Sequence, residues 1–249
     1  MIVMDLTVLG CYGGYPYNGI GTSSYLITSG AYHLLLDCGS GALTALQRYL
    51  DPLQLDAVLL THYHHDHTAD VGVLQYLWQL APGAKKEPVL PIYGHTADAD
   101  HFAGLTWPDA TQGVAYDPQQ RLTLGPLTVT FGATHHPVPA YAPIITETAT
   151  GKRLAFTADT AAFPALATWA QGADVLLADT NFYADHQGTA WHLTSTQAGQ
   201  LAHDAAVKRL LLTHLPQTGS LAQLQAEAQT AAGEAIPTAV VQAGATYRI

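Results

Sequence analysis

Four histidines and one aspartate fall within six consecutive positions, in the segment 60–67 (LTHYHHDH). Imidazole nitrogens and carboxylate oxygens are donor atoms that bind transition-metal ions in proteins. In an extended segment the side chains of His62 and His64 point to the same side, so both can bind one ion. Asp66 and His67, beyond the bend, can face a second ion. The segment is therefore predicted to be part of a metal site.

The alternative interpretation of this segment is a solvated, histidine-rich loop. A short, wholly apolar strand is expected directly before it, at Ala57–Leu60. The loops that follow such strands are where α/β proteins place their ligand sites, which favours the metal-binding interpretation. His65 lies between the paired donors and is expected to be structural or solvent-facing.

Three further segments end an apolar strand in a residue that can bind metal. They are residues 131–136 (FGATHH), 154–159 (LAFTAD) and 210–214 (LLLTH). A buried strand does not normally end in a charge unless the charge has a partner. Together with the histidine-rich segment they supply ligands for two ions, and Asp159 is suited to bridging them.

These motifs together resemble the metallo-β-lactamase superfamily over almost the whole chain. The family signature H-x-H-x-D-H is matched by His62, His64, Asp66 and His67, and the later ligands are matched by His136, Asp159 and His214. The resemblance implies that one ion is bound by His62, His64 and His136 and the other by Asp66, His67 and His214, with Asp159 between them. It also implies a four-layer αββα sandwich, in which two sheets pack face to face with helices outside.

Two more positions follow from the same resemblance. His136 is preferred to His135 because the residues after it, 137–141 (PVPAY), resemble the family's segment after that ligand. Asp37 matches the family's earlier acidic position, whose side chain orients the histidine loop. Besides binding metal, Asp66 is expected to position or deprotonate the attacking water.

Within the superfamily the chain is most similar to the ribonuclease Z-like phosphodiesterases. Residues 178–182 (ADTNF) resemble their acidic segment, with aspartate where glutamate is usual, and residues 191–194 (WHLT) resemble their H-x-T motif at a helix start. By this resemblance His192, assisted by Asp179, protonates the leaving oxygen. The alternative for His192 is a neutral side chain at a helix terminus.

Two departures from ribonuclease Z favour a small phosphodiester substrate over a folded tRNA. Only about two dozen residues separate His136 from Asp159, which leaves no room for the protruding arm that grips tRNA. The basic opening loop of that family is replaced by residues 12–18 (YGGYPYN), whose aromatic rings either stack on a base or roof the cleft. A small-molecule or short phosphodiester is therefore the expected substrate.

The two ions determine the expected mechanism. A pair of neighbouring divalent ions lowers the pKa of a bridging water, so that hydroxide exists near neutral pH, and neutralises the phosphate oxygens during in-line attack. Imidazole-rich ligation favours zinc, with manganese and iron as alternatives because carboxylates contribute to both positions. The sequence thus predicts a dinuclear metal-dependent hydrolase, acting as a phosphodiesterase.

Two other functions compete with this prediction. A hydrolase of the same fold could act on a lactone, a thioester or a β-lactam, because an activated water attacks carbonyls as readily as phosphorus. Only His192 and Asp179 separate that function from a phosphodiesterase at the level of sequence. The third hypothesis is a non-catalytic metal-binding protein that has kept the fold, and the intact motifs argue against it.

Hydrophobic patterning predicts many strands first and then alternating helices and strands, which indicates an α/β (α+β) fold of mixed sheets covered by helices. Strands are expected at Met1–Leu9, Ser24–Ser29, Tyr32–Asp37, Ala57–Leu60, Val89–Tyr93, Leu122–Leu124, Leu127–Ala133, Ile144–Thr148, Arg153–Ala158, Val175–Ala178, Arg209–Thr213 and Ala239–Val241. Helices are expected at Ala42–Tyr49, Ala69–Leu80, Ala161–Ala170, Thr194–Ala206 and Leu221–Ala232, with a polar loop at Thr61–Thr68. The buried stripe of the second helix is predicted to be Val73, Leu74, Leu77 and Trp78. Thr194 is predicted to cap its helix, with Gln197 completing a capping box.

Composition limits the partners and the location. With 48% apolar and 11% charged residues, the 249-residue chain is expected to form one domain over residues 1–249. Its net charge of -10, with nine scattered basic residues, argues against binding long nucleic acid. The start lacks a signal peptide and no apolar run is long enough for a membrane span, so no membrane partner is expected. Cys11 and Cys38 are too few for a disulfide framework, which indicates a cytoplasmic setting. The assembly is left open, with a homodimer considered.

Overall fold

The computed structural model describes residues 3–249, and its strands form two sheets. The first sheet has the order β15 (Thr246–Arg248), β1 (Met4–Tyr12), β3 (Ser24–Ser29), β4 (Tyr32–Leu36), β5 (Ala57–Leu59), β6 (Leu90–Gly94) and β7 (Thr111–Ala115), with β2 (Gly21–Thr22) beside β1. The second has the order β14 (Thr238–Val240), β13 (Leu210–Thr213), β12 (Val175–Asp179), β11 (Arg153–Phe156), β10 (Tyr141–Glu147), β9 (Leu127–Ala133) and β8 (Leu122–Leu124). The first two positions of the predicted opening strand, Met1 and Ile2, lie outside the described residues.

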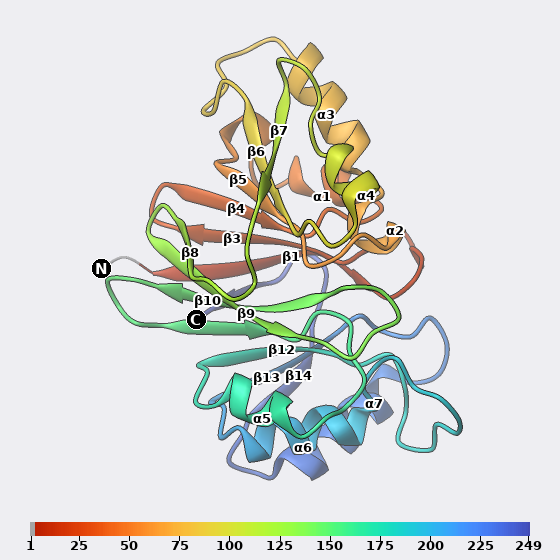
Figure 1. The fold of residues 1–249 in the computed structure, drawn as a ribbon. Helices are drawn as coiled ribbons and strands as arrows, with labels where there is room; N and C mark the ends of the chain where they lie inside the picture. The colour runs from red at the N-terminus through yellow and green to blue at the C-terminus, as the bar shows by residue number, and fades with distance from the viewer. Residues whose placement is uncertain (1–2) are drawn as a thin grey trace.

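Helices lie beside each sheet, on the side away from the other sheet (Figure 1). The helices beside the first sheet are α1 (Ala42–Leu46), α2 (His65–Thr68), α3 (Val71–Leu80) and α4 (Ala99–Ala103), with a short 3-10 helix at Pro52–Gln54. Those beside the second sheet are α5 (Ala165–Ala170), α6 (Ser195–Asp204) and α7 (Leu221–Ala232). The predicted four-layer αββα sandwich is confirmed.

Three adjacent leucines of β4 show why both faces of a sheet are covered. Leu34 and Leu36 are buried in the core between the two sheets, whereas Leu35 is buried in a second core beneath α1 and α3. Successive side chains of a strand point to opposite faces, so an unbroken apolar run can be buried only if another layer covers each face. Tyr25 of β3 and Phe156 of β11 meet in the inter-sheet core, with their ring centroids 5.3 Å apart.

Strand direction determines where the functional loops lie. Strands β4, β5, β6 and β7 pair in parallel, and β1 runs the same way as β4 because both are antiparallel to β3. In the second sheet β11, β12, β13 and β14 pair in parallel. Strand β9 has the same direction, because β9 and β11 are both antiparallel to β10. A parallel bridge between Tyr12 and Leu215 joins the carboxyl ends of β1 and β13. The loops after these strands therefore meet at one edge of the sandwich.

Some predicted elements differ from the structure. Residues 61–68, expected as a loop, end in the short helix α2. The buried stripe of α3 is confirmed in part: Leu74 and Trp78 are buried and Leu77 packs partly buried against the same core. Val73 is wrong, because it is 52% exposed, and Val71 and Gln75 complete the buried side instead. The apolar residues of α3 fit two overlapping stripes, and contact with the sheet selects one of them. Strands β7 and β15 were not predicted; both are edge strands that pair on one side only.

The capping box before α6 is confirmed. The hydroxyl of Thr194 accepts a hydrogen bond from the backbone N–H of Gln197 at 3.2 Å, and the Gln197 side chain accepts one from the backbone N–H of Thr194 at 2.9 Å. The cap fixes the direction in which the preceding residues, including His192, enter the helix. Within residues 3–249, no helix combines the length and the apolar character needed to cross a bilayer.

Candidate metal centre

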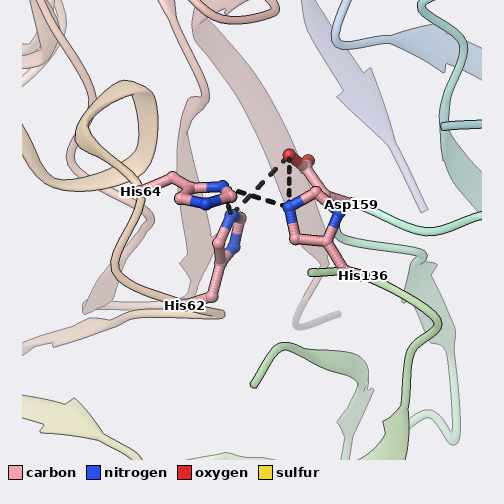
Figure 2. Close-up of side chains that lie close together, drawn as sticks. All are labelled: His62, His64, His136 and Asp159. Carbon is pink, nitrogen blue, oxygen red and sulfur yellow. Dashed lines mark hydrogen bonds and ion pairs between the residues drawn. The ribbon is translucent and has the colours of Figure 1, made fainter. Parts of the chain in front are cut away.

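His62, His64, His136 and Asp159 form the first group of potential metal ligands (Figure 2). His64 Nδ1 lies 3.2 Å from His62 Nε2 and 3.0 Å from His136 Nε2. Asp159 Oδ2 lies 3.6 Å from His62 Nε2 and 3.8 Å from His136 Nε2. Ligands about 2.0–2.1 Å from a tetrahedral zinc ion would be about 3.3–3.4 Å apart, close to these spacings. One ion therefore fits between the four donor atoms.

Asp66, His67, Asp159 and His214 form the second group. His214 Nε2 lies 3.0 Å from Asp66 Oδ2 and 3.4 Å from Asp159 Oδ2. His67 Nε2 lies 3.2 Å from Asp159 Oδ1 and 3.7 Å from Asp66 Oδ2. Asp159 belongs to both groups, which is the position that a bridging carboxylate would take.

The choice between two adjacent histidines is visible in the structure. His136 lies in the first group, whereas the ring of His135 stacks on Phe163 with centroids 4.1 Å apart. The backbone N–H of His135 donates to the hydroxyl of Thr160, 3.1 Å away, which holds this residue away from the centre. His65 is exposed, as expected.

Two buried donor atoms of the centre lie 3.2 Å apart without making a hydrogen bond. Among the described residues, His67 Nε2 and Asp159 Oδ1 are buried without a hydrogen bond. An unsatisfied buried polar atom costs about 1–3 kcal/mol, and coordination of a cation would remove that cost. The imidazole and carboxylate donors are also of the type that binds transition-metal ions. The residues of both groups thus fit metal ions.

The charges at the centre also favour the binding of cations. Burial alone would lower the pKa of His214, but the carboxylates of Asp159 and Asp179 raise it to about 10. Burial alone would raise the pKa of Asp159, but the imidazoles of His214, His67 and His62 hold it well below its usual value. A proton held so strongly between carboxylates marks a region of negative potential. A divalent cation could occupy this region in place of the protons.

Asp37 holds one residue of the second group, His67, through the ring nitrogen that does not face the other ligands. Its Oδ2 lies 2.7 Å from His67 Nδ1 and accepts a hydrogen bond from the Ser23 hydroxyl at 2.9 Å. Its Oδ1 accepts hydrogen bonds from the backbone N–H and the hydroxyl of Thr61, at 2.9 and 3.0 Å. Because His67 Nδ1 carries the proton for this contact, Nε2 of the neutral ring is left with the lone pair that a metal needs.

Three residues at the centre have the left-handed backbone conformation. The φ angles are 54° for Asp37, 50° for Ala158 and 52° for His214. This conformation costs about 1–2 kcal/mol in residues other than glycine and is concentrated at functional sites. Each of these residues lies just beyond a strand, where the turn directs Asp37, Asp159 and His214 to the same edge. The strain is consistent with a functional role for this edge.

His192 and Asp179 form a pair next to the second group. His192 Nδ1 lies 2.8 Å from Asp179 Oδ2, and the other oxygen of Asp179 lies 3.3 Å from His214 Nδ1. Burial alone would lower the pKa of His192, but the Asp179 carboxylate raises it above its usual value. His192 can therefore hold a proton near neutral pH. With Nδ1 turned to Asp179, Nε2 is the nitrogen that can exchange this proton with a ligand.

A pocket of about 340 Å³ opens over both groups and over His192. Its wall also includes Tyr15, Trp191 and Gln217. Among the described residues that line it there is no lysine or arginine. A bound anion would therefore depend on metal ions for its neutralisation.

Several supporting residues were missed by sequence reasoning. The backbone N–H of Gly14 donates to Asp66 Oδ2 at 2.7 Å, and the side chain of Asn181 donates to the carbonyl of His214 at 2.9 Å. A Cβ on Gly13 would lie 2.6 Å from the His214 ring, so only glycine fits there without a shift. The glycine-rich loop expected after the first strand, Met1–Leu9, was the one signal of this close approach.

Comparison with known proteins gives a family and several relatives. A sequence model described as the beta-lactamase superfamily domain matches residues 32–215, which contain both ligand groups. The chain is 47% identical over 229 residues to a protein of Bacillus subtilis (strain 168) named probable metallo-hydrolase YhfI, covering 91% of this chain and 93% of that protein. The crystal structure of YhfI, described as a metallo-beta-lactamase fold protein, matches with a TM-score of 0.93 and 42% identity over 100% of both chains.

More distant relatives carry ribonuclease names. Ribonuclease Z of Myxococcus xanthus (strain DK1622) is 26% identical over 276 residues, covering 86% of this chain and 88% of that protein. The short form of human tRNase Z shares the fold, with a TM-score of 0.72 and 18% identity over 98% of both chains.

Proposed function

The chain belongs to the metallo-β-lactamase superfamily, in its ribonuclease Z-like branch, and from that premise we propose that this hydrolase is a dinuclear phosphodiesterase acting on small phosphodiesters. Zinc is the proposed metal, because the two ligand groups together offer five imidazoles and two carboxylates. The proposed ligands are His62, His64 and His136 for one ion and Asp66, His67 and His214 for the other, with Asp159 shared.

The observation that carries the proposal is the contact of 2.8 Å between His192 and Asp179 beside the two groups. Cleavage of a phosphodiester releases an alkoxide, a poor leaving group unless a proton reaches it in the transition state. A positioned general acid contributes about 10²–10⁴-fold to such a step. Asp179 holds the His192 ring and raises its pKa, so that His192 is suited to donate this proton from Nε2.

The other residues of the site would bind the metal ions, orient the attacking water and fix the ligand side chains. When bound, the two ions supply Lewis acidity, which lowers the pKa of water and neutralises the phosphate charge. Asp66 is fixed by the N–H of Gly14 and lies at the pocket surface, where its carboxylate can orient a water for attack. Asp37 fixes the ring of His67 through Nδ1.

The chain between His136 and Asp159 supports a small substrate. Most of this stretch forms β10 (Tyr141–Glu147), β11 (Arg153–Phe156) and the turn between them. No residues are left over for an arm that could grip a tRNA. A pocket of about 340 Å³ with no lysine or arginine in its described lining likewise suits a compact substrate with little negative charge.

The test compares two phosphodiesters that differ in their need for an acid. Protein of known metal content is assayed with bis(p-nitrophenyl) phosphate, whose leaving group is already stable, and with a dinucleotide, whose leaving alkoxide needs a proton. We expect His192→Ala to lower kcat for the dinucleotide about 10²–10⁴-fold and to affect the nitrophenyl ester much less. His203→Ala, in the α6 helix and outside the ligand groups, is the matched control.

Two outcomes would contradict the proposal. Equal rates for wild type and His192→Ala on the dinucleotide would remove the acid role. Absence of turnover of both phosphodiesters with zinc, manganese or cobalt, together with hydrolysis of a lactone or thioester, would establish a carbonyl hydrolase instead.

A further inference from the structure

We propose that Trp191 and Tyr15 form a stacking subsite for a nucleobase, so that the site selects nucleoside phosphodiesters with a single negative charge. This inference rests on the proposed phosphodiesterase function, in which the metal centre would hold the phosphate. Both aromatic side chains line the pocket over the centre, and both are largely exposed, Trp191 by 47% and Tyr15 by 57%.

The backbone of each aromatic residue is tied to a different ligand group. The carbonyl oxygen of Trp191 lies 3.3 Å from His136 Nδ1, in the first group. On the other side, Gly14 donates to Asp66 of the second group, and Gln217 Nε2 donates to the carbonyl of Tyr15 at 3.0 Å. The backbone of both residues is therefore held beside the pocket by contacts that do not use the rings.

Neither ring is occupied by packing with another aromatic ring. Tyr12 and Tyr17, in the same loop as Tyr15, pack against each other with centroids 5.5 Å apart. In the part of the chain that the structure describes, Trp191 and Tyr15 make no such contact. Partly exposed rings in the pocket lining can contact a planar group of a substrate, and every nucleobase offers a face for stacking.

Charge restricts the rest of the substrate. Carboxylates of Asp66 and Asp159 lie in the pocket wall, and no lysine or arginine lines it among the described residues. Two divalent ions can neutralise one phosphodiester, but additional phosphates would find no lysine or arginine among the described lining residues. Affinity beyond the phosphate must therefore come from uncharged contacts. Stacking of one base on an aromatic side chain supplies about 5- to 150-fold in affinity.

Binding can be tested without turnover. Thymidine is titrated into the metal-loaded protein while intrinsic tryptophan fluorescence is recorded, and 2-deoxyribose, which lacks the nucleobase, is the control. We expect thymidine alone to change the fluorescence, and Trp191→Leu to remove this change. Trp107→Leu is the matched control, because Trp107 is also partly exposed (37%) but lies outside the pocket. A thymidine response that persists in Trp191→Leu, or its absence in the wild type, would overturn the subsite.

Kinetics test selectivity with two esters that share their leaving group and charge. They are thymidine 5′-(p-nitrophenyl) phosphate and methyl p-nitrophenyl phosphate. We expect the ratio of their kcat/KM values to fall about tenfold in Trp191→Leu and in Tyr15→Leu. The ratio should be kept in Trp191→Phe, in Trp107→Leu and in Tyr76→Leu, a control for an exposed tyrosine elsewhere.

The outcomes separate the two proposals. An unchanged ratio in Trp191→Leu would show that the ring only shields the centre, and would refute the subsite. If neither ester is hydrolysed while thymidine still changes the fluorescence of Trp191, the phosphodiesterase proposal fails and the ring-binding subsite stands. Circular dichroism identifies any leucine variant that does not fold; if this is Trp191→Leu, the ester ratio in Tyr15→Leu and the thymidine titration of the wild type decide.

Discussion

Asp37→Asn is expected to weaken metal binding although Asp37 belongs to neither ligand group. Asparagine has nearly the same shape and tolerates the left-handed backbone that Asp37 adopts at φ 54°. The substitution therefore changes the chemistry of the side chain with little effect on the backbone. What is lost is one acceptor oxygen and the carboxylate charge that orients the ring of His67.

The expected magnitude follows from the contacts of Asp37. The carboxylate accepts from Ser23, from the backbone and hydroxyl of Thr61, and from His67 Nδ1. Ser23 and His67 share one oxygen of Asp37, and the two donors of Thr61 share the other. An amide has only one oxygen, so one of these two pairs loses its acceptor. Loss of a partner that orients a ligating histidine typically costs 10–100-fold in metal affinity, or about 1.4–2.7 kcal/mol.

The assay is competition for zinc between the apoprotein and a chelator of known affinity, with the metal bound to the protein as the readout. Asp56→Asn is the matched control: Asp56 is a buried aspartate of the same half, and it accepts from the backbone of His33 and from Lys86 away from the centre. Both variants are expected to lose stability, measured by urea unfolding, but only Asp37→Asn should lose zinc affinity. Equal zinc affinity in Asp37→Asn and wild type would refute the reasoning.

Two further predictions concern the same edge and a distant ion pair. Gly13→Ala should lower zinc affinity in the same competition assay, because its Cβ would meet the His214 ring at 2.6 Å, whereas Gly72→Ala, with open space around it, should not. Burial would raise the pKa of Asp174, but hydrogen bonds from Lys208 and Lys152 lower it to about 2. Since this is below the unfolded value of 3.8, the stabilisation is present above about pH 4 and is lost as pH falls towards 2. In urea unfolding, Asp174→Asn should therefore be less stable than wild type at pH 6, with a difference that shrinks below pH 4; a constant difference would contradict this.

Residue types and their local spacing were enough to propose the residues that the structure brings together in the two groups. His62, His64, Asp66 and His67 are separated by so few residues that one bend brings them together whatever the rest of the fold does. His214 and Asp159 could be recognised because each ends an apolar strand, and a buried strand cannot end in an unpaired charge without cost. The four-layer architecture was implied by the resemblance to the superfamily, and the structure gives its physical reason, because β4 is buried on both faces.

Contacts between distant segments decided the rest. His64 directs Nδ1 to the centre whereas His62 directs Nε2, and a sequence contains no information on which ring nitrogen a neighbour will occupy. The N–H of Gly14 reaches Asp66, and the carbonyl of Trp191 reaches His136, only because β1, β5, β9 and β12 end at the same edge. The buried face of α3 was likewise selected by the sheet beneath it. Local patterns determine which atoms can bind, whereas strand pairing over long chain separations determines which of them meet.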